Sequence, residues 1–75
     1  MEITFDSEAD ALYIRLSTRR PDHGMDVEEG VTVDLDKHGH IVGIEILDAS
    51  RRLRTDNPLS VTVKDLAHER QLATG

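Results

Sequence analysis

The chain has 75 residues, no cysteine and a formal net charge of −6. This length corresponds to one small domain, in which a single apolar core is barely large enough for stability. The absence of cysteine excludes disulfides, cysteine-ligated metal sites and a cysteine nucleophile. The acidic charge and the presence of only one Phe and one Tyr argue against nucleic-acid binding, because phosphates need a basic face and bases need aromatic surface.

The charge is distributed unevenly along the chain. Residues 1–48 hold twelve acidic and four basic residues, which gives −8, whereas residues 49–75 hold three acidic and five basic residues, which gives +2. The acidic part is either a solvated sheet face or a surface that attracts a basic partner or the chain's own C-terminal part. No stretch resembles a signal peptide or reaches membrane-spanning length, so we expect a soluble cytoplasmic protein.

A β-hairpin is the first predicted element, formed by residues 2–6 and 11–17. Apolar and polar residues alternate in both segments, which is the period of a strand with one solvated face. The polar residues Ser7 to Asp10 connect the two strands. One register places all apolar side chains on a common face. It sets Asp6 opposite Ala11, Phe5 opposite Leu12 and Ile3 opposite Ile14.

The segment from Ser17 to Asp26 is predicted to be a loop, because it contains Pro21, Gly24 and many polar residues. The stretch after it, Val27 to Glu29, could extend the following strand, with a bend at Gly30.

The strongest pattern in the sequence lies at Val31 to Asp48 and predicts a second hairpin. Opposite residues of a hairpin share a face, so a common apolar side requires an even-numbered loop. A two-residue loop at His38-Gly39, in a type I′ turn, or a four-residue loop from Lys37 to His40 would satisfy this condition. The expected pairs are Leu35 with Val42, Val33 with Ile44, and Val31 with Ile46.

A short helix is predicted at Ala49 to Leu53, capped by Asp48 or Ser50 and ended before Pro58. The remainder of the chain is ambiguous. Leu59, Val61 and Val63 alternate as in a strand, whereas Val63 to Leu72 has helical spacing, so we predict a strand-like lead into a helix of about ten residues.

The predicted fold is therefore α+β and mainly β. It has two consecutive β-hairpins in a four-stranded antiparallel sheet, a short helix, and a C-terminal strand/helix segment that packs on one face. Residues 1–75 form one domain, with residues 1–48 as the two-hairpin sheet and residues 49–75 as a helical C-terminal extension. Because the C-terminal part has few apolar residues to cover the sheet, we expect a homodimer with Leu59 to Leu72 at or near its interface.

Three stretches of the sequence resemble a family of small prokaryotic proteins known as domain of unknown function 2283. These are I-T-F-D-S-E-A-D-A-L-Y-I-R-L-S near the N-terminus, G-V-T-V-D-L-D, and G-H-I-V-G-I-E-I-L-D-A-S-R-R-L. Together they cover Glu2 to Leu53. The resemblance implies a small, mainly β domain without an established activity. Some members of the family look like the smaller partner of a toxin–antitoxin-like pair, but this assigns no role to any residue here.

Two clusters could in principle bind metal ions. The spacing Asp6-x-Glu8-x-Asp10 is that of a calcium loop, but Ala11 and Ser17 stand where such a loop needs a glycine and a carboxylate. The second cluster has carboxylates and imidazoles, which are common zinc ligands. We favour a solvated turn, because the sequence shows no buried residues that would hold these side chains in a ligand geometry. This cluster comprises Asp34, Asp36, His38 and His40.

No motif indicates catalysis. Glu45 and Asp34 face the same side and could form a carboxylate pair, but ordinary strand charges are the better interpretation. Arg51, Arg52 and Arg54 are interpreted as an exposed helix face that neutralises nearby carboxylates, or as a contact to phosphate or an acidic partner. We assign no catalytic, metal or cofactor-binding residue and no cofactor.

The sequence favours a non-enzymatic protein-interaction module that is homo-oligomeric and antitoxin-like towards a basic partner. Two alternatives stay open. One is a weak metal or small-ligand binder at the Asp34 to His40 turn, and the other is a small enzyme of unknown reaction.

Overall fold

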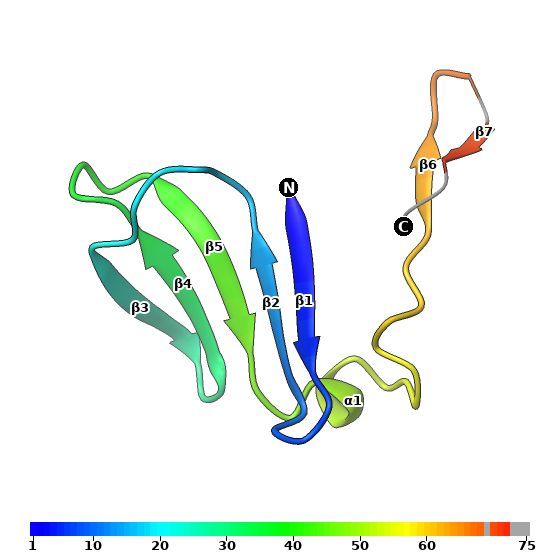
Figure 1. Ribbon diagram of the computed structural model, residues 1–75, viewed down its shortest axis with the longest axis horizontal. Coiled ribbons are helices and arrows are strands. Elements are labelled where there is room, and N and C mark those ends of the chain that lie inside the picture. The colour runs from blue at the N-terminus through cyan, green and yellow to red at the C-terminus, as the bar shows by residue number, and fades with distance from the viewer. Residues whose placement is uncertain (69, 73–75) are drawn as a thin grey trace.

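A computed structural model describes residues 1–68 and 70–72. Five strands form one antiparallel sheet in the order β1-β2-β5-β4-β3, and two further strands, β6 and β7, form a separate two-stranded sheet (Figure 1). The mainly β class is confirmed, but the main sheet has five strands where four were expected. The elements are β1 (Glu2–Asp6), β2 (Ala11–Arg15), β3 (His23–Glu28), β4 (Val31–Leu35), β5 (Ile41–Ile46), α1 (Ala49–Arg52), β6 (Val63–Asp65) and β7 (Arg70–Leu72).

The first hairpin forms with the predicted register. Asp6 lies opposite Ala11, Phe5 opposite Leu12, and Ile3 opposite Ile14. The Asp6 carboxylate accepts hydrogen bonds from the backbone N–H groups of Glu8 (3.0 Å) and Ala9 (3.1 Å). A short acidic side chain therefore shapes this turn by binding its own backbone.

The predicted loop from Ser17 to Asp26 is wrong over its second half. His23–Glu28 forms the edge strand β3, which pairs antiparallel with β4 and has an irregularity between Asp26 and Glu28. Val27 therefore belongs to a separate strand and does not extend β4, because Glu29 and Gly30 turn the chain back. Gly30 has φ of +84°, a conformation that glycine adopts without strain.

The turn between β4 and β5 differs from both predicted loops. The Gly39 N–H donates to the Asp36 carbonyl (3.0 Å) and the Asp36 N–H donates to the His40 carbonyl (2.8 Å), so three residues, Lys37 to Gly39, form the loop. Gly39 has φ of +83°, whereas His38 is not among the residues with positive φ. The type I′ turn at His38-Gly39 is thus wrong. The bonding fits a three-residue loop that ends in a left-handed glycine.

A β-bulge allows this odd-numbered loop to keep the apolar residues on one face. Val33 lies opposite Ile44 and Val31 opposite Ile46, as predicted, but Leu35 lies opposite Ile41 and not Val42. The register shifts between Asp34 and Leu35, which leaves one extra residue on β5. The alternation of residue types excludes a three-residue loop only if the β4–β5 pairing continues without a bulge.

The short helix α1 forms as predicted, with Asp48 at the N-cap position. However, the Asp48 side chain makes no capping hydrogen bond. Asp10, from the β1–β2 turn, takes this role. Its carboxylate accepts hydrogen bonds from the Ser50 N–H (3.1 Å) and the Ser50 hydroxyl (2.6 Å), and its carbonyl accepts one from the Ala49 N–H (2.9 Å). The helix is thereby joined to the end of the first hairpin.

The predicted C-terminal helix from Val63 to Leu72 is wrong over its described residues. Val63–Asp65 and Arg70–Leu72 pair as antiparallel strands, with Val63 opposite Leu72. The Asp65 carboxylate accepts a hydrogen bond from the Ala67 N–H (3.1 Å), so Asp65 favours a turn over continued helix. The hairpin stands apart from the main sheet and does not pack on it as a helix (Figure 1). In the described part of the chain, no helix is long and apolar enough to cross a membrane.

Candidate functional site

One face of the five-stranded sheet is almost entirely apolar. Cross-strand neighbours share a face, so the observed register places apolar side chains in two continuous rows. One row is Phe5, Leu12, Ile46 and Val31, and the other is Ile3, Ile14, Ile44, Val33 and Met25. The second row crosses all five strands. We call these nine residues the apolar face.

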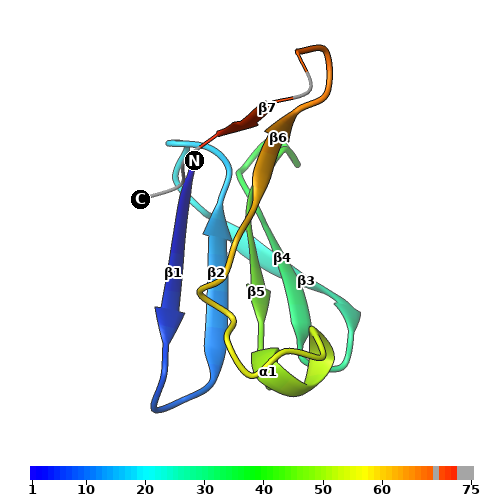
Figure 2. The same cartoon turned by 90° about the vertical axis from the view of Figure 1, so that its right-hand side faces the viewer.

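Within the described residues, no second layer of strands or helices covers this face. Of its nine residues, Leu12 is buried, Met25 is 54% exposed and the other seven are partly exposed. Figure 2 shows the five strands side by side, with α1 at one end of the sheet, and Figure 1 shows the C-terminal hairpin well away from it. An apolar sheet face that stays partly exposed to water is a candidate surface for a partner.

The total surface of the chain supports the same view. It exposes 5968 Å². A compact monomer of 8.4 kDa is expected to expose about 4,600 Å². The excess of roughly 1,400 Å² exceeds the ~800 Å² that each partner buries in a standard protein–protein interface.

The opposite face of the sheet, which we call the polar face, is acidic. Its carboxylates are contributed by four strands, and the one basic residue at the strand positions of this face is Arg15, opposite Glu2. They belong to Glu2, Asp6, Asp26, Asp34 and Glu45. The two faces of one sheet therefore differ sharply in their chemistry.

Tyr13 lies across the centre of the polar face. Its hydroxyl donates a hydrogen bond to Asp34 Oδ2 (2.9 Å), two strands away. The ring reaches Asp34 by passing over Gly43, where a Cβ atom would lie 2.6 Å from Tyr13 Cζ and 2.9 Å from the Ile14 carbonyl oxygen. Burial and then the hydrogen bond to Asp34 raise the pKa of Tyr13 above its ordinary value of 10.0. The Tyr13 side chain is therefore uncharged at neutral pH, and its hydroxyl links β2 to Asp34 on β4.

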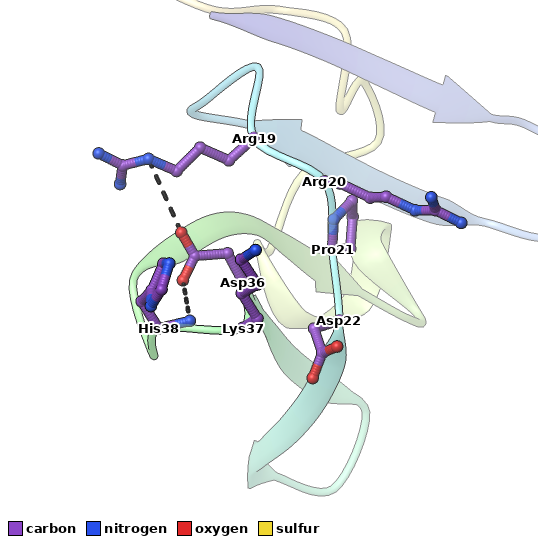
Figure 3. Close-up of a pocket in the computed structure, with 7 residues that line it drawn as sticks. All are labelled: Arg19, Arg20, Pro21, Asp22, Asp36, Lys37 and His38. Atoms are coloured by element: carbon purple, nitrogen blue, oxygen red, sulfur yellow. Dashed lines mark hydrogen bonds and ion pairs between the residues drawn. The ribbon is translucent and has the colours of Figure 1, made fainter.

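A shallow cleft lies at the loop end of the sheet (Figure 3). Its lining comes from the β2–β3 connection and the β4–β5 turn, and consists of Arg19, Arg20, Pro21, Asp22, Asp36, Lys37 and His38. Figure 3 shows the Arg19 and Arg20 side chains pointing in opposite directions, so these two cationic groups do not converge on one ligand position.

Asp36 is the buried polar residue of this cleft, and it serves the turn. Its Oδ1 atom accepts hydrogen bonds from the backbone N–H groups of His38 and His40, each at 2.9 Å. Its Oδ2 atom lies 3.7 Å from Arg19 Nε. The His40 N–H bond, followed by the His38 bond, lowers the pKa of Asp36 below its ordinary value. The carboxylate thus stays ionised and holds the turn in shape.

The structure does not bring together the side chains of the candidate metal cluster at the Asp34 to His40 turn. The carboxylate of Asp34 binds the Tyr13 hydroxyl, and that of Asp36 binds two backbone N–H groups. No three His, Asp or Glu side chains are grouped as metal ligands within residues 1–68 and 70–72. Glu45 and Asp34 share the polar face, as expected. Tyr13 lies opposite Glu45, and its hydroxyl binds Asp34.

Two of the three carboxylates in the calcium-like spacing, those of Asp6 and Asp10, have structural partners. Asp6 binds its own turn and Asp10 binds Ser50, 40 residues away. Sequence reasoning missed this second contact, because nothing in the spacing of Asp10 and Ser50 indicates it. The position of Tyr13 over Gly43 carried a signal, since a glycine inside a strand marks a close approach.

Two of the three clustered arginines pair with carboxylates. Arg51 lies 3.2 Å from Asp48, and Arg52 lies 3.8 Å from Glu28. Arg52 also donates a hydrogen bond to the Glu29 carbonyl, and a Cβ atom at Gly30 would contact its guanidinium. Arg52 therefore fastens α1 to the β3–β4 turn.

These features define a small antiparallel β-sheet protein with one apolar face and one acidic face. The chain belongs to a family described as "Protein of unknown function (DUF2283)", whose sequence model matches residues 2–50. This match covers the five-stranded sheet and the start of α1, and it confirms the resemblance seen in the sequence. No curated protein and no solved structure matches the chain significantly.

Proposed function

We propose that this chain is a non-enzymatic protein-interaction module that assembles with a second copy of itself through the apolar face. The observation that carries the proposal is the apolar face, which crosses the whole sheet and is not covered by a second layer of the described residues. A second copy is the partner because its surface has the same chemistry and size, and because isologous pairing is the commonest way to complete a small domain.

The dimensions of the face account for part of such an interface. Neighbouring strands lie about 4.8 Å apart and residues along a strand rise about 3.3 Å each, so the face measures roughly 19 by 17 Å between backbone positions, which is about 320 Å². A standard interface buries ~800 Å² on each partner, so a dimer of this chain would also use surface outside the face, for which the excess of roughly 1,400 Å² per copy is sufficient.

Light scattering across a dilution series tests the proposal. We expect twice the chain mass for the wild type and the mass of one chain for Met25→Glu. Met25 is 54% exposed on edge strand β3, so this change places a charge on the apolar face without opening a buried core. The matched control, Thr4→Glu, adds the same charge to the polar face of edge strand β1 and should remain a dimer. A wild type with the mass of one chain at ~100 µM would refute the proposal.

The polar face favours a second role, the binding of a basic protein as in an antitoxin-like pair. Five carboxylates on one surface attract cations through their summed field, and this attraction weakens with salt. An oligolysine peptide is a suitable probe. Its affinity should fall with salt and in the double variant Asp26→Asn, Glu45→Gln.

The control for this second role removes the same number of charges elsewhere. Glu8 and Asp56 are exposed and lie outside the strands of the polar face, so Glu8→Gln, Asp56→Asn should weaken binding less. Equal losses in the two double variants would mean that net charge, and not the polar face, attracts the peptide.

A further inference from the structure

The C-terminal arm, residues 54–68 and 70–72, does not pack on the five-stranded sheet. It contains a hairpin of two three-residue strands, β6 and β7, that forms its own sheet. Figure 1 shows this hairpin projecting from α1 and separated from the five-stranded sheet. A two-stranded hairpin is marginally stable at best in water, so the arm needs a surface on which to pack.

Two apolar side chains of the arm are exposed to water. Leu59 is 66% exposed and Leu66 is 83% exposed. Single exposed leucines are ordinary, but these two lie on a segment that is itself separated from a core. The chain thus has two incomplete parts, an apolar face without a cover and an arm without a support.

The C-terminal segment that contains the arm carries no net charge. Residues 54–75 hold three basic and three acidic residues, so the +2 of residues 49–75 comes from Arg51 and Arg52 of α1. The acidic sheet therefore does not repel this segment as a whole, and the polar residues of the arm can stay at the rim of the apolar face while its leucines are buried.

We infer that two copies exchange arms, so that the arm of each copy lies across the apolar face of the other copy. This inference rests on the proposed self-association and names the element that covers the face. The second copy receives the arm because the arm leaves α1 in a direction away from its own sheet (Figure 1). Exchange of an identical element between protomers gives each chain the cover that it lacks.

The absence of cysteine makes a spin-label experiment selective. A nitroxide is attached to Ser60→Cys in full-length chains that carry no isotope. These are mixed with wild-type chains whose Ile, Val and Thr methyl groups are isotope-labelled. Every loss of methyl signal is then an effect of one chain on another. Because Ser60 is an exposed polar residue of the arm, the substitution keeps both leucines, and Thr62→Cys is a second site.

Arm exchange predicts a loss of signal from the methyl groups of Ile14, Ile44 and Val33 on the apolar face. The matched methyl groups of Thr4 and Thr32 on the polar face should lose much less. A nitroxide at Thr4→Cys should not give this pattern.

The possible failures are distinguishable. A dimer by light scattering without methyl losses between chains would overturn arm exchange and leave self-association intact. Losses seen only when label and isotope are in the same chain, diluted into unlabelled protein, would show that the arm folds back on its own sheet and would also overturn it. A chain that stays monomeric would overturn both the arm exchange and the self-association.

Discussion

Single side chains in this small protein connect elements that lie far apart in the sequence. Tyr13 on β2 crosses Gly43 on β5 to bind Asp34 on β4, so one phenol connects three strands. Asp10 connects a turn to a helix that begins 39 positions later in the sequence. Such contacts stabilise a fold with few buried apolar residues, because each one orders two elements at once.

The titration of Tyr13 tests the first of these contacts. The chain has one Tyr and no Trp, so tyrosinate absorbance reports this residue alone. We expect a pKa above 10.0 in the wild type and a lower value in Asp34→Asn, because the hydrogen bond and the Asp34 charge both favour the neutral phenol. The value in the variant should remain above 10.0, since burial, the largest cause, is unchanged.

The sign of the accompanying stability change follows from linkage. A pKa raised by folding contributes stability that is complete below the unfolded-state value and is lost as pH rises through the folded-state value. The wild type should therefore lose free energy of unfolding above pH 10, and Tyr13→Phe should lack this component. A wild-type Tyr13 that titrates at its ordinary value would contradict the assigned contact.

Asp36 should act at the opposite end of the pH scale. Its pKa is lowered in the folded state, chiefly by the hydrogen bond from the His40 N–H, so its contribution is present above pH 3.8 and is lost as pH falls through the folded-state value. We expect the difference in free energy of unfolding between wild type and Asp36→Asn to be constant near neutral pH and to shrink below about pH 3.8. A difference that persists unchanged into acid would argue against an ionised Asp36 in the turn.

At the scale of elements, the β4–β5 turn offers a direct test of its conformation. In the observed three-residue loop, only Gly39 has positive φ. Gly39→Ala should cost about 1 kcal/mol, because alanine is strained in that region. His38→Gly should also destabilise, by up to about 1 kcal/mol, through the entropy of the unfolded chain. Urea unfolding measures both, and a stabilising His38→Gly would instead indicate a type I′ turn.

The alternation of apolar and polar residues was sufficient to predict strand pairing where one face had to be apolar and the pairing was regular. It predicted the register of β1 with β2 and the pairs Val33–Ile44 and Val31–Ile46. It failed at the bulge beside Leu35, because a bulge changes parity without changing the alternation of residue types.

Other elements depend on contacts that local pattern does not contain. The edge strand β3 has only exposed residues and includes Gly24, so pairing with β4, and not burial, defines it. The spacing of Val63, Leu66 and Ala67 fits a helix, but Asp65 binds the Ala67 N–H and the chain turns back there. The apolar face was predictable from alternation, whereas the Asp10–Ser50 contact was not. For the Tyr13–Asp34 contact, Gly43 inside a strand signalled a close approach but not which residues make it.

At the scale of the whole molecule, the chain has one broad sheet and a separate C-terminal hairpin. Its sheet is wide enough for a layered domain, but the described residues supply no second layer, and its surface exceeds that of a compact monomer by roughly 1,400 Å². A five-stranded sheet whose apolar face stays partly exposed would leave part of its hydrophobic free energy unused. Folding and association are therefore expected to be coupled.

Coupled folding and association should make stability depend on protein concentration. For a dimer that unfolds directly to two chains, each tenfold increase in concentration shifts the unfolding equilibrium by about 1.4 kcal/mol per mole of dimer. The urea midpoint of the wild type should therefore rise steadily from ~1 µM to ~100 µM. Thr4→Glu should show the same slope, because its added charge lies on the polar face.

The variant Met25→Glu distinguishes the contribution of association from that of the folded single chain in this experiment. With a charge on the apolar face, its midpoint should be lower than that of the wild type and should no longer change with concentration. A wild-type midpoint that is independent of concentration, with cooperative unfolding throughout, would show that one chain completes its own core. The apolar face would then have to be covered by the chain's own arm in solution.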